Sequence, residues 1–153
     1  LANWQRVMAV NATGTFVMTQ AVFGAMLDRG WGRVINVASI AGLEGSKYTA
    51  SYSASKHAVL GFTRSAAAEA EGKGVTVNAI CPGYVDTPMT ATTVANVMER
   101  TGKSEADALQ AVLDHAGQPC LVMPTEIAEV VLDLCSSECD DWNGEIVVMD
   151  GTD

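Results

Sequence analysis

Basic residues are scarce in this sequence: 9 lysines and arginines stand against 18 aspartates and glutamates. The resulting formal charge of −9 leaves little cationic surface to bind a nucleic-acid backbone or an anionic membrane. The chain also lacks an uninterrupted apolar run of roughly 18 residues, the length that a membrane span needs. We therefore expect neither a nucleic-acid partner nor a membrane partner.

Metal-ligating residues are also few, with two histidines and four cysteines in the whole chain. None of the cysteines belongs to a C-x-x-C pair, so we expect no zinc site and no other metal. Scattered cysteines without a disulfide framework are typical of a reducing compartment, and the expected location is the cytoplasm. The four are Cys81, Cys120, Cys135 and Cys139.

Apolar residues are plentiful: they make up 48% of the 153 residues, enough for one domain with a sizeable core. Apolar positions at three- and four-residue steps predict a largely buried helix over 3–28. Three short, β-branched runs predict buried parallel strands over 33–38, 75–80 and 145–149. Further helices are expected over 51–71, from Ser104 to a stop at Gly117, and from Thr125.

The predicted order of elements is α-β-α-β-α-α-β, which is typical of an α/β fold with a parallel sheet and right-handed crossovers. The strand at 33–38 would have an open edge if nothing preceded it. Since Leu1 is not a natural start, we expect further strands before it and interpret the chain as the C-terminal piece of a longer protein.

Polar residues gather where the first two predicted strands end, which is where ligands bind in open parallel sheets. Ser39 directly follows the first strand, and Pro82 and Gly83 follow the second. Tyr52 and Lys56 are four residues apart on the intervening helix and therefore share one face. A lysine ammonium beside a phenol favours the phenolate, so the pair can exchange a proton with an alcohol or carbonyl, while a serine hydroxyl donates to the same oxygen.

This conjunction resembles the short-chain dehydrogenase/reductase family along essentially the whole chain. The segment Tyr52-Ser53-Ala54-Ser55-Lys56 is similar to the family's active-site motif, and 36–42 is similar to the segment that carries its catalytic serine. Asn11 matches the asparagine that completes the catalytic tetrad. The segment 78–87 resembles the loop on the nicotinamide side, and 145–151 resembles the closing strand.

The resemblance implies a Rossmann-like, doubly wound parallel sheet with helices on both faces. It implies that Tyr52 is the general acid/base, that Lys56 lowers the pKa of the phenol and holds the nicotinamide ribose, and that Ser39 orients the substrate oxygen. Asn11 would hold a water for proton relay. The cofactor, NAD or NADP with NAD slightly favoured, would contact Tyr52 and Lys56 and a second group of residues, namely Pro82, Gly83, Val85 and Thr87.

The family's Gly-rich phosphate loop is missing, because the G-x-G pairs at 30/32 and 72/74 precede strands rather than helices. We therefore interpret residues 1–153 as the C-terminal catalytic portion of one such domain. The long polar stretch contains one lone amphipathic helix, and residues 88–123 of it are expected to form a substrate lid. The chain by itself is expected to be inactive.

The expected substrate is a small secondary alcohol or ketone, and the lid region looks most like the branch acting on 3-hydroxybutyrate. That branch has a histidine where Ala41 stands and a lysine where Thr49 stands, so a hydroxyacyl thioester or an uncharged alcohol stays open beside a 3-hydroxy acid. The helices over 3–28 and 51–71 are expected to pack against a second copy in a homodimer or homotetramer.

Two other functions stay open. One is a non-catalytic fragment or assembly module, which would keep the oligomer helices and bind no cofactor. The other is a nucleotide-sugar epimerase, which also uses Tyr-x-x-x-Lys. An epimerase needs a larger C-terminal substrate domain, and only 97 residues follow Lys56.

Overall fold

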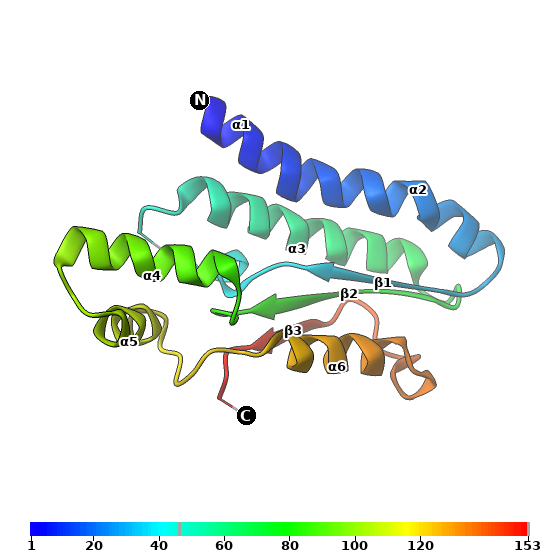
Figure 1. The fold of residues 1–153 in the computed structure, drawn as a ribbon. Helices are drawn as coiled ribbons and strands as arrows, with labels where there is room; N and C mark the ends of the chain where they lie inside the picture. Colours follow the sequence, from blue (N-terminus) through cyan, green and yellow to red (C-terminus); the bar gives the residue numbers. More distant parts are fainter. Residues whose placement is uncertain (46, 153) are drawn as a thin grey trace.

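The computed structural model describes residues 1–45 and 47–152, and it contains a parallel sheet with helices on both faces (Figure 1). The strands are β1 (Gly32–Val37), β2 (Val75–Pro82) and β3 (Ile146–Met149), in the spatial order β1-β2-β3. Helix α3 (Ala50–Ala70) covers one face and α6 (Pro124–Cys135) covers the other. The predicted doubly wound α/β architecture is confirmed.

The central strand β2 is buried along all of its eight residues, as its continuous apolar run predicts. It pairs with β1 from Gly32 opposite Val75 onward, and with β3 from Ala79 opposite Ile146 to Pro82 opposite Met149. The strand was expected to stop before Pro82, and it does not. A proline is tolerated at this terminal position because the next residue supplies the amide: Gly83 N–H donates to the Met149 carbonyl at 2.8 Å.

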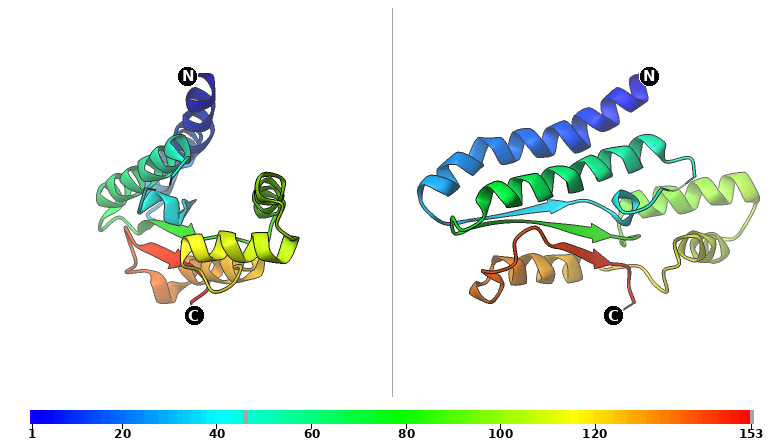
Figure 2. Two further views of the ribbon diagram at one scale, coloured as in Figure 1. Left: turned by 90° about the vertical axis from the view of Figure 1, so that its left-hand side faces the viewer. Right: turned by 180° about the vertical axis from the view of Figure 1, so that it is seen from behind.

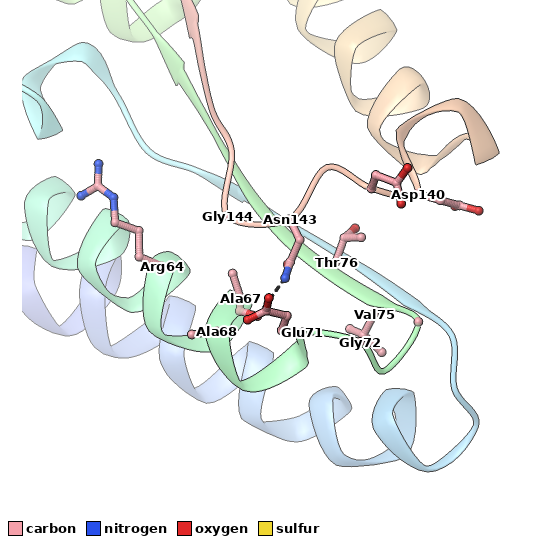
Figure 3. A pocket seen from close by; sticks show the side chains of 12 residues that line it. Arg64, Ala67, Ala68, Glu71, Gly72, Val75, Thr76, Asp140, Asn143 and Gly144 are labelled. Carbon is pink, nitrogen blue, oxygen red and sulfur yellow. Dashed lines mark hydrogen bonds between the residues drawn. The ribbon is translucent and has the colours of Figure 1, made fainter.

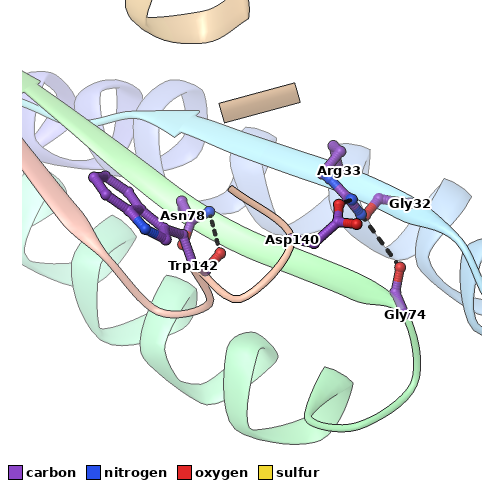
Figure 4. Close-up of polar contacts among 6 residues, drawn as sticks. All are labelled: Gly32, Arg33, Gly74, Asn78, Asp140 and Trp142. Carbon is purple, nitrogen blue, oxygen red and sulfur yellow. Dashed lines mark hydrogen bonds and ion pairs between the residues drawn. The ribbon is translucent and has the colours of Figure 1, made fainter. Parts of the chain in front are cut away.

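The two G-x-G pairs meet where β1 and β2 begin. Gly74 has a φ of 71°, and a Cβ there would lie 2.1 Å from the Gly30 carbonyl oxygen. Arg33 ties this corner together, because it donates to the Gly74 carbonyl at 3.3 Å and forms an ion pair with Asp140 in the loop before β3 (Figure 4). These glycines therefore serve a close crossing of two turns, in agreement with their interpretation as something other than a phosphate loop.

The first helical segment is less buried than expected. It consists of α1 (Ala2–Met8), a π-helical turn (Ala9–Thr13) and α2 (Gly14–Asp28), and Thr19 is the one buried residue in these elements. One side packs along α3, where the Phe16 and Phe62 rings meet edge-to-face at 5.6 Å. The other side is exposed because one helix layer and a narrow sheet cannot cover both; Val10, Val17, Met18 and Val22 lie there.

Residues Ala2–Asp28 are also long and apolar enough to cross a membrane by length and composition alone, although the apolar run is interrupted. Core helices of globular proteins pass the same test. In this structure the segment lies beside α3 in all three views (Figures 1 and 2), and Phe23, Met26 and Leu27 pack against the core formed by α3, β1 and β2.

The segment after β2 contains two helices, α4 (Pro88–Thr101) and α5 (Glu105–Ala116), so the expectation of one lone helix is wrong. The threonine-rich start tolerates a helix, because Pro88 suits a first turn and the Thr92 and Thr93 hydroxyls are satisfied within it by donating to the Pro88 and Met89 carbonyls. Helix α5 begins and ends as predicted, with the Ser104 side chain accepting from Asp107 N–H and Gly117 in the left-handed conformation.

Candidate active site

Ser39 lies just beyond the carboxyl end of β1, with 8% of its surface exposed. Its Oγ accepts a hydrogen bond from Ala41 N–H at 3.1 Å and thereby caps a short 3₁₀ turn, Ile40–Gly42. This bond fixes the position of the oxygen and uses one of its lone pairs. A hydroxyl held in this way keeps a proton with which to donate to a substrate oxygen.

Tyr52 and Lys56 lie on the first turns of α3 and share one face, as predicted. The Lys56 Nζ lies 5.6 Å from the centre of the Tyr52 ring and donates to the Val37 carbonyl at 2.9 Å. Since Val37 is the last residue of β1, the lysine joins the helix to the strand end that Ser39 follows. Burial lowers the pKa of Lys56, and the nearby Cys81 opposes that shift in part.

Cys81 occupies the end of β2 next to this group and is fully buried. Burial raises the pKa of the Cys81 thiol, while a hydrogen bond from the Ser39 backbone and the charge of Lys56 act in the opposite direction. The structure therefore brings Ser39, Lys56 and the end of β2 together around a thiol that stays neutral near pH 7.

The loop after β2 holds the remaining predicted cofactor residues. Val85 forms a parallel bridge with Val122, and its carbonyl accepts from the Thr87 hydroxyl at 3.3 Å and from the Thr90 hydroxyl at 2.6 Å. Thr87 is the residue immediately before α4. The loop is thus held at two points. Gly83 bonds to Met149 at the end of β3, and Val85 pairs with Val122.

Tyr84 is a half-buried aromatic residue of this loop. Burial raises the pKa of Tyr84, and electrostatic interaction with Tyr52 adds to the shift. The Tyr84 ring also packs against the cluster formed by Val94, Ala108 and Val112 between α4 and α5. One aromatic side chain of the loop therefore packs against both helices of the expected lid.

Asn11 lies in the π-helical turn, where a helix offers an irregular backbone that is common at functional sites. Its Nδ2 donates to the Ser55 hydroxyl at 3.0 Å, and that hydroxyl donates to the Tyr52 carbonyl at 2.7 Å. Its own carbonyl accepts from the Thr15 hydroxyl at 2.7 Å. Asn11 is thus connected to the backbone of Tyr52, whereas its expected role in holding a water remains a prediction.

A hollow of about 680 Å³ lies at the opposite ends of the strands, between the end of α3 and the loop before β3 (Figure 3). Arg64, Glu71, Thr76, Asp140 and Asn143 are among its lining residues, and none of the predicted site residues is. Asn143 is committed to structure there, because it accepts from Val77 N–H and donates to the Ala67 carbonyl. We therefore place the candidate site at the carboxyl ends of the strands.

Three side chains that support this site could not be recognised from local sequence patterns. Ser55 belongs to the Tyr/Lys motif and Tyr84 to the predicted nicotinamide-side loop, whereas Gln118 lies in neither. Gln118 is 3% exposed, although glutamine beside a helix-ending glycine is normally a surface residue. Its contacts come from residues 34 positions away, which local patterns do not report.

The family model described as "short chain dehydrogenase" matches residues 1–98. The chain is 35% identical over 151 residues to 3-oxoacyl-(acyl-carrier-protein) reductase FabG of Aquifex aeolicus. This match covers 99% of this chain and 56% of that protein. The chain is also 35% identical over 150 residues to D-beta-hydroxybutyrate dehydrogenase of Rhizobium meliloti, covering 97% and 58%.

A solved structure with a similar fold is that of F189W actinorhodin polyketide ketoreductase with NADPH. Its TM-score is 0.88 at 36% identity, and the match covers 98% of this chain and 59% of that one. The chain thus spans a little over half the length of these proteins.

Proposed function

The chain belongs to the short-chain dehydrogenase family, and from this premise we propose that the protein is an oxidoreductase that interconverts a secondary alcohol and a ketone. The observation that carries the proposal is the junction of β1 and α3, where the half-buried Lys56 lies beside the Tyr52 ring and bonds to the end of the strand that Ser39 follows. An acid/base pair and a hydroxyl donor at one strand end suit proton transfer to and from a carbonyl oxygen.

The donor set around this junction fits a nicotinamide cofactor, NAD or NADP. Lys56 offers hydrogen-bond donors, which suit a ribose hydroxyl. The Thr87 hydroxyl would donate to a phosphate or carboxamide oxygen by turning away from its 3.3 Å bond with the Val85 carbonyl. When bound, the nicotinamide supplies or accepts the hydride. Pro82, Gly83 and Val85 would line the nicotinamide side through the loop that β3 and Val122 hold in place.

In the direction of ketone reduction, Tyr52 Oη donates its proton to the carbonyl oxygen, and the Ser39 hydroxyl donates a hydrogen bond to the same atom. The ammonium of Lys56 stabilises the phenolate that remains. Asn11 acts through Ser55, whose hydroxyl donates to the backbone of Tyr52, and we propose that it also holds a water on the path that returns a proton to Lys56.

The proposed substrates are 3-hydroxy acids and 3-hydroxyacyl thioesters with the matching 3-keto compounds. The similarity to reductases and dehydrogenases named for such compounds supports this class. Ala41 and Thr49 supply no cation for a free carboxylate, which favours the thioester. Rates of the full-length protein with acetoacetate and acetoacetyl-CoA, each with NADH and NADPH, test the proposal; no turnover of either would contradict it.

We propose a homodimer or homotetramer, because the outer side of α2 exposes apolar residues that a second copy would cover. We also propose a cytoplasmic location. All four cysteines are free thiols, as expected for a reducing compartment.

The 153-residue chain by itself is proposed to bind dinucleotide poorly and to turn over no alcohol. Among its described residues, no G-x-G pair lies between a strand and the helix that follows it, so this chain does not supply the phosphate loop typical of such folds. Titrating NADH into the purified chain and following fluorescence tests this. Saturable binding below about 1 μM would contradict it, since that affinity corresponds to more than about 8 kcal/mol.

A further inference from the structure

The Gln118 side-chain amide pairs with the backbone of Tyr84 through both its oxygen and its nitrogen. Its Oε1 accepts from the Tyr84 N–H at 2.7 Å, and its Nε2 donates to the Tyr84 carbonyl at 2.8 Å. The same Nε2 donates to the Cys120 carbonyl at 2.6 Å. Gln118 is 3% exposed, so these three bonds are made almost entirely out of contact with water.

These bonds join the two ends of the segment that contains α4 and α5. Val122 N–H donates to the Tyr84 carbonyl at 3.0 Å, and Asp86 N–H donates to the Val122 carbonyl at 2.9 Å. Gln118 closes the same junction from the α5 side, directly after Gly117 ends that helix. The loop that follows β2 and the chain that returns from α5 are therefore held in one fixed relation.

The space around the amide is also fitted to the loop. A Cβ on Gly83 would lie 2.3 Å from the Gln118 Oε1, so a larger residue at either position would displace the other. A carboxamide of this length provides one acceptor and two donors in one plane, a combination that glutamate and methionine of similar length do not offer. Losing it would leave the backbone N–H of the half-buried Tyr84 without this acceptor and its carbonyl with the Val122 N–H as partner.

We propose that Gln118 is a positioning residue, which fixes the backbone of residues 83–87 in the conformation that receives the nicotinamide end of the cofactor. The inference rests on the proposed function, because it assigns that loop to the nicotinamide side. Gln118 acts through the Tyr84 backbone and touches no reacting atom.

The test compares Gln118→Glu with Gln110→Glu in the full-length protein. Gln110 lies on the exposed side of α5, where its amide donates to Asp114 at 2.7 Å, so the control introduces the same charge on the helix that precedes Gln118. Gln118→Met, which is neutral and similar in length, is measured as well and decides the result if the glutamate variant does not fold.

The readout is the Kd of the reduced cofactor, NADH or NADPH, against the Kd of the matching ADP-ribose compound that lacks nicotinamide. Since the buried Gln118 amide loses the two hydrogen bonds that its Nε2 donates, Gln118→Glu should raise the Kd of the reduced cofactor by about tenfold or more. The Kd of the ADP-ribose compound should stay within about twofold, because the same adenosine and phosphate contacts remain. Gln110→Glu should change neither value.

Unchanged binding of the reduced cofactor by the folded Gln118 variants would overturn the inference and leave the proposed function standing. A parallel loss for both ligands would also overturn it, because that result indicates general destabilisation rather than positioning of one end. A wild-type protein that binds neither NADH nor NADPH would instead overturn the proposed function, and the inference with it.

Discussion

The ammonium of Lys56 lies 5.6 Å from the centre of the Tyr52 ring, within the range of a cation–π contact. The same nitrogen is anchored to the Val37 carbonyl, so the pair is fixed against the end of β1 rather than extended into solvent. The cation is therefore beside the phenol before any ligand binds. Substitutions that remove the Tyr52 hydroxyl or the Lys56 ammonium test this relation.

Tyr52→Phe removes the hydroxyl and keeps the ring that Lys56 faces. We expect kcat of the full-length protein to fall by about 10²-fold or more, as is typical when a general acid/base is lost, with the circular dichroism spectrum unchanged. Tyr48→Phe is the control, because Tyr48 is 98% exposed. Retention of more than about a tenth of kcat by the Tyr52 variant would exclude the proton-transfer role.

Stability should depend on pH through Lys56. Burial lowers the pKa of this group, so in the folded state the ammonium is disfavoured relative to the unfolded state. The resulting cost is full below the folded pKa and shrinks as the pH rises towards the unfolded value of 10.5, because the unfolded chain then also loses its proton. The wild type should therefore gain stability relative to Lys56→Met as the pH is raised.

Urea unfolding of both proteins between about pH 7 and 10 measures this difference. Lys73→Met is the matched control, because the Lys73 Nζ also donates to a backbone carbonyl, that of Glu69, and remains exposed. Its difference from wild type gives the effect of removing an exposed lysine, which is subtracted from that of Lys56→Met. A flat difference for Lys56 after this subtraction would show that its burial does not disfavour the ammonium.

Association should depend on the outer side of α2. Met18 is 70% exposed in the single chain, and we expect Met18→Glu to shift the full-length protein from dimer or tetramer towards monomer in sedimentation experiments at micromolar concentration. A buried, unpaired carboxylate is costly at an apolar interface. Met89→Glu on α4 is the control, since Met89 is 73% exposed. A wild-type monomer would contradict the proposed assembly.

The segment 88–123 should exchange its amide hydrogens faster than β2 and should slow when cofactor and substrate bind. Helices α4 and α5 have a small cluster of their own, whereas β2 is buried along its whole length. Segments with separate, small cores open more easily, and lids gate sites of this kind. Exchange as slow as in β2, unchanged by ligands, would rule out a lid.

Local patterns in the sequence determined the three strands, the helix beginning at Ser104 and the stop at Gly117. They also placed Ser39, Tyr52 and Lys56 at one end of the sheet. This was possible because apolar runs and caps act over a few residues, and because parallel strands bring their carboxyl ends to the same edge. The α/β fold and the meeting of these three residues near that edge needed no long-range information.

Tertiary structure decided the rest. Whether the apolar helix at 2–28 is covered depends on how much surface α3 and the sheet can offer, and its outer side stays exposed. Helix α4 is held by a contact with α5, because Val94 packs with Ala108 and Val112. Gln118 is buried because a loop 34 residues earlier in the chain supplies its partners. A sequence window records the residues near each position, whereas such contacts exist only once the chain has folded.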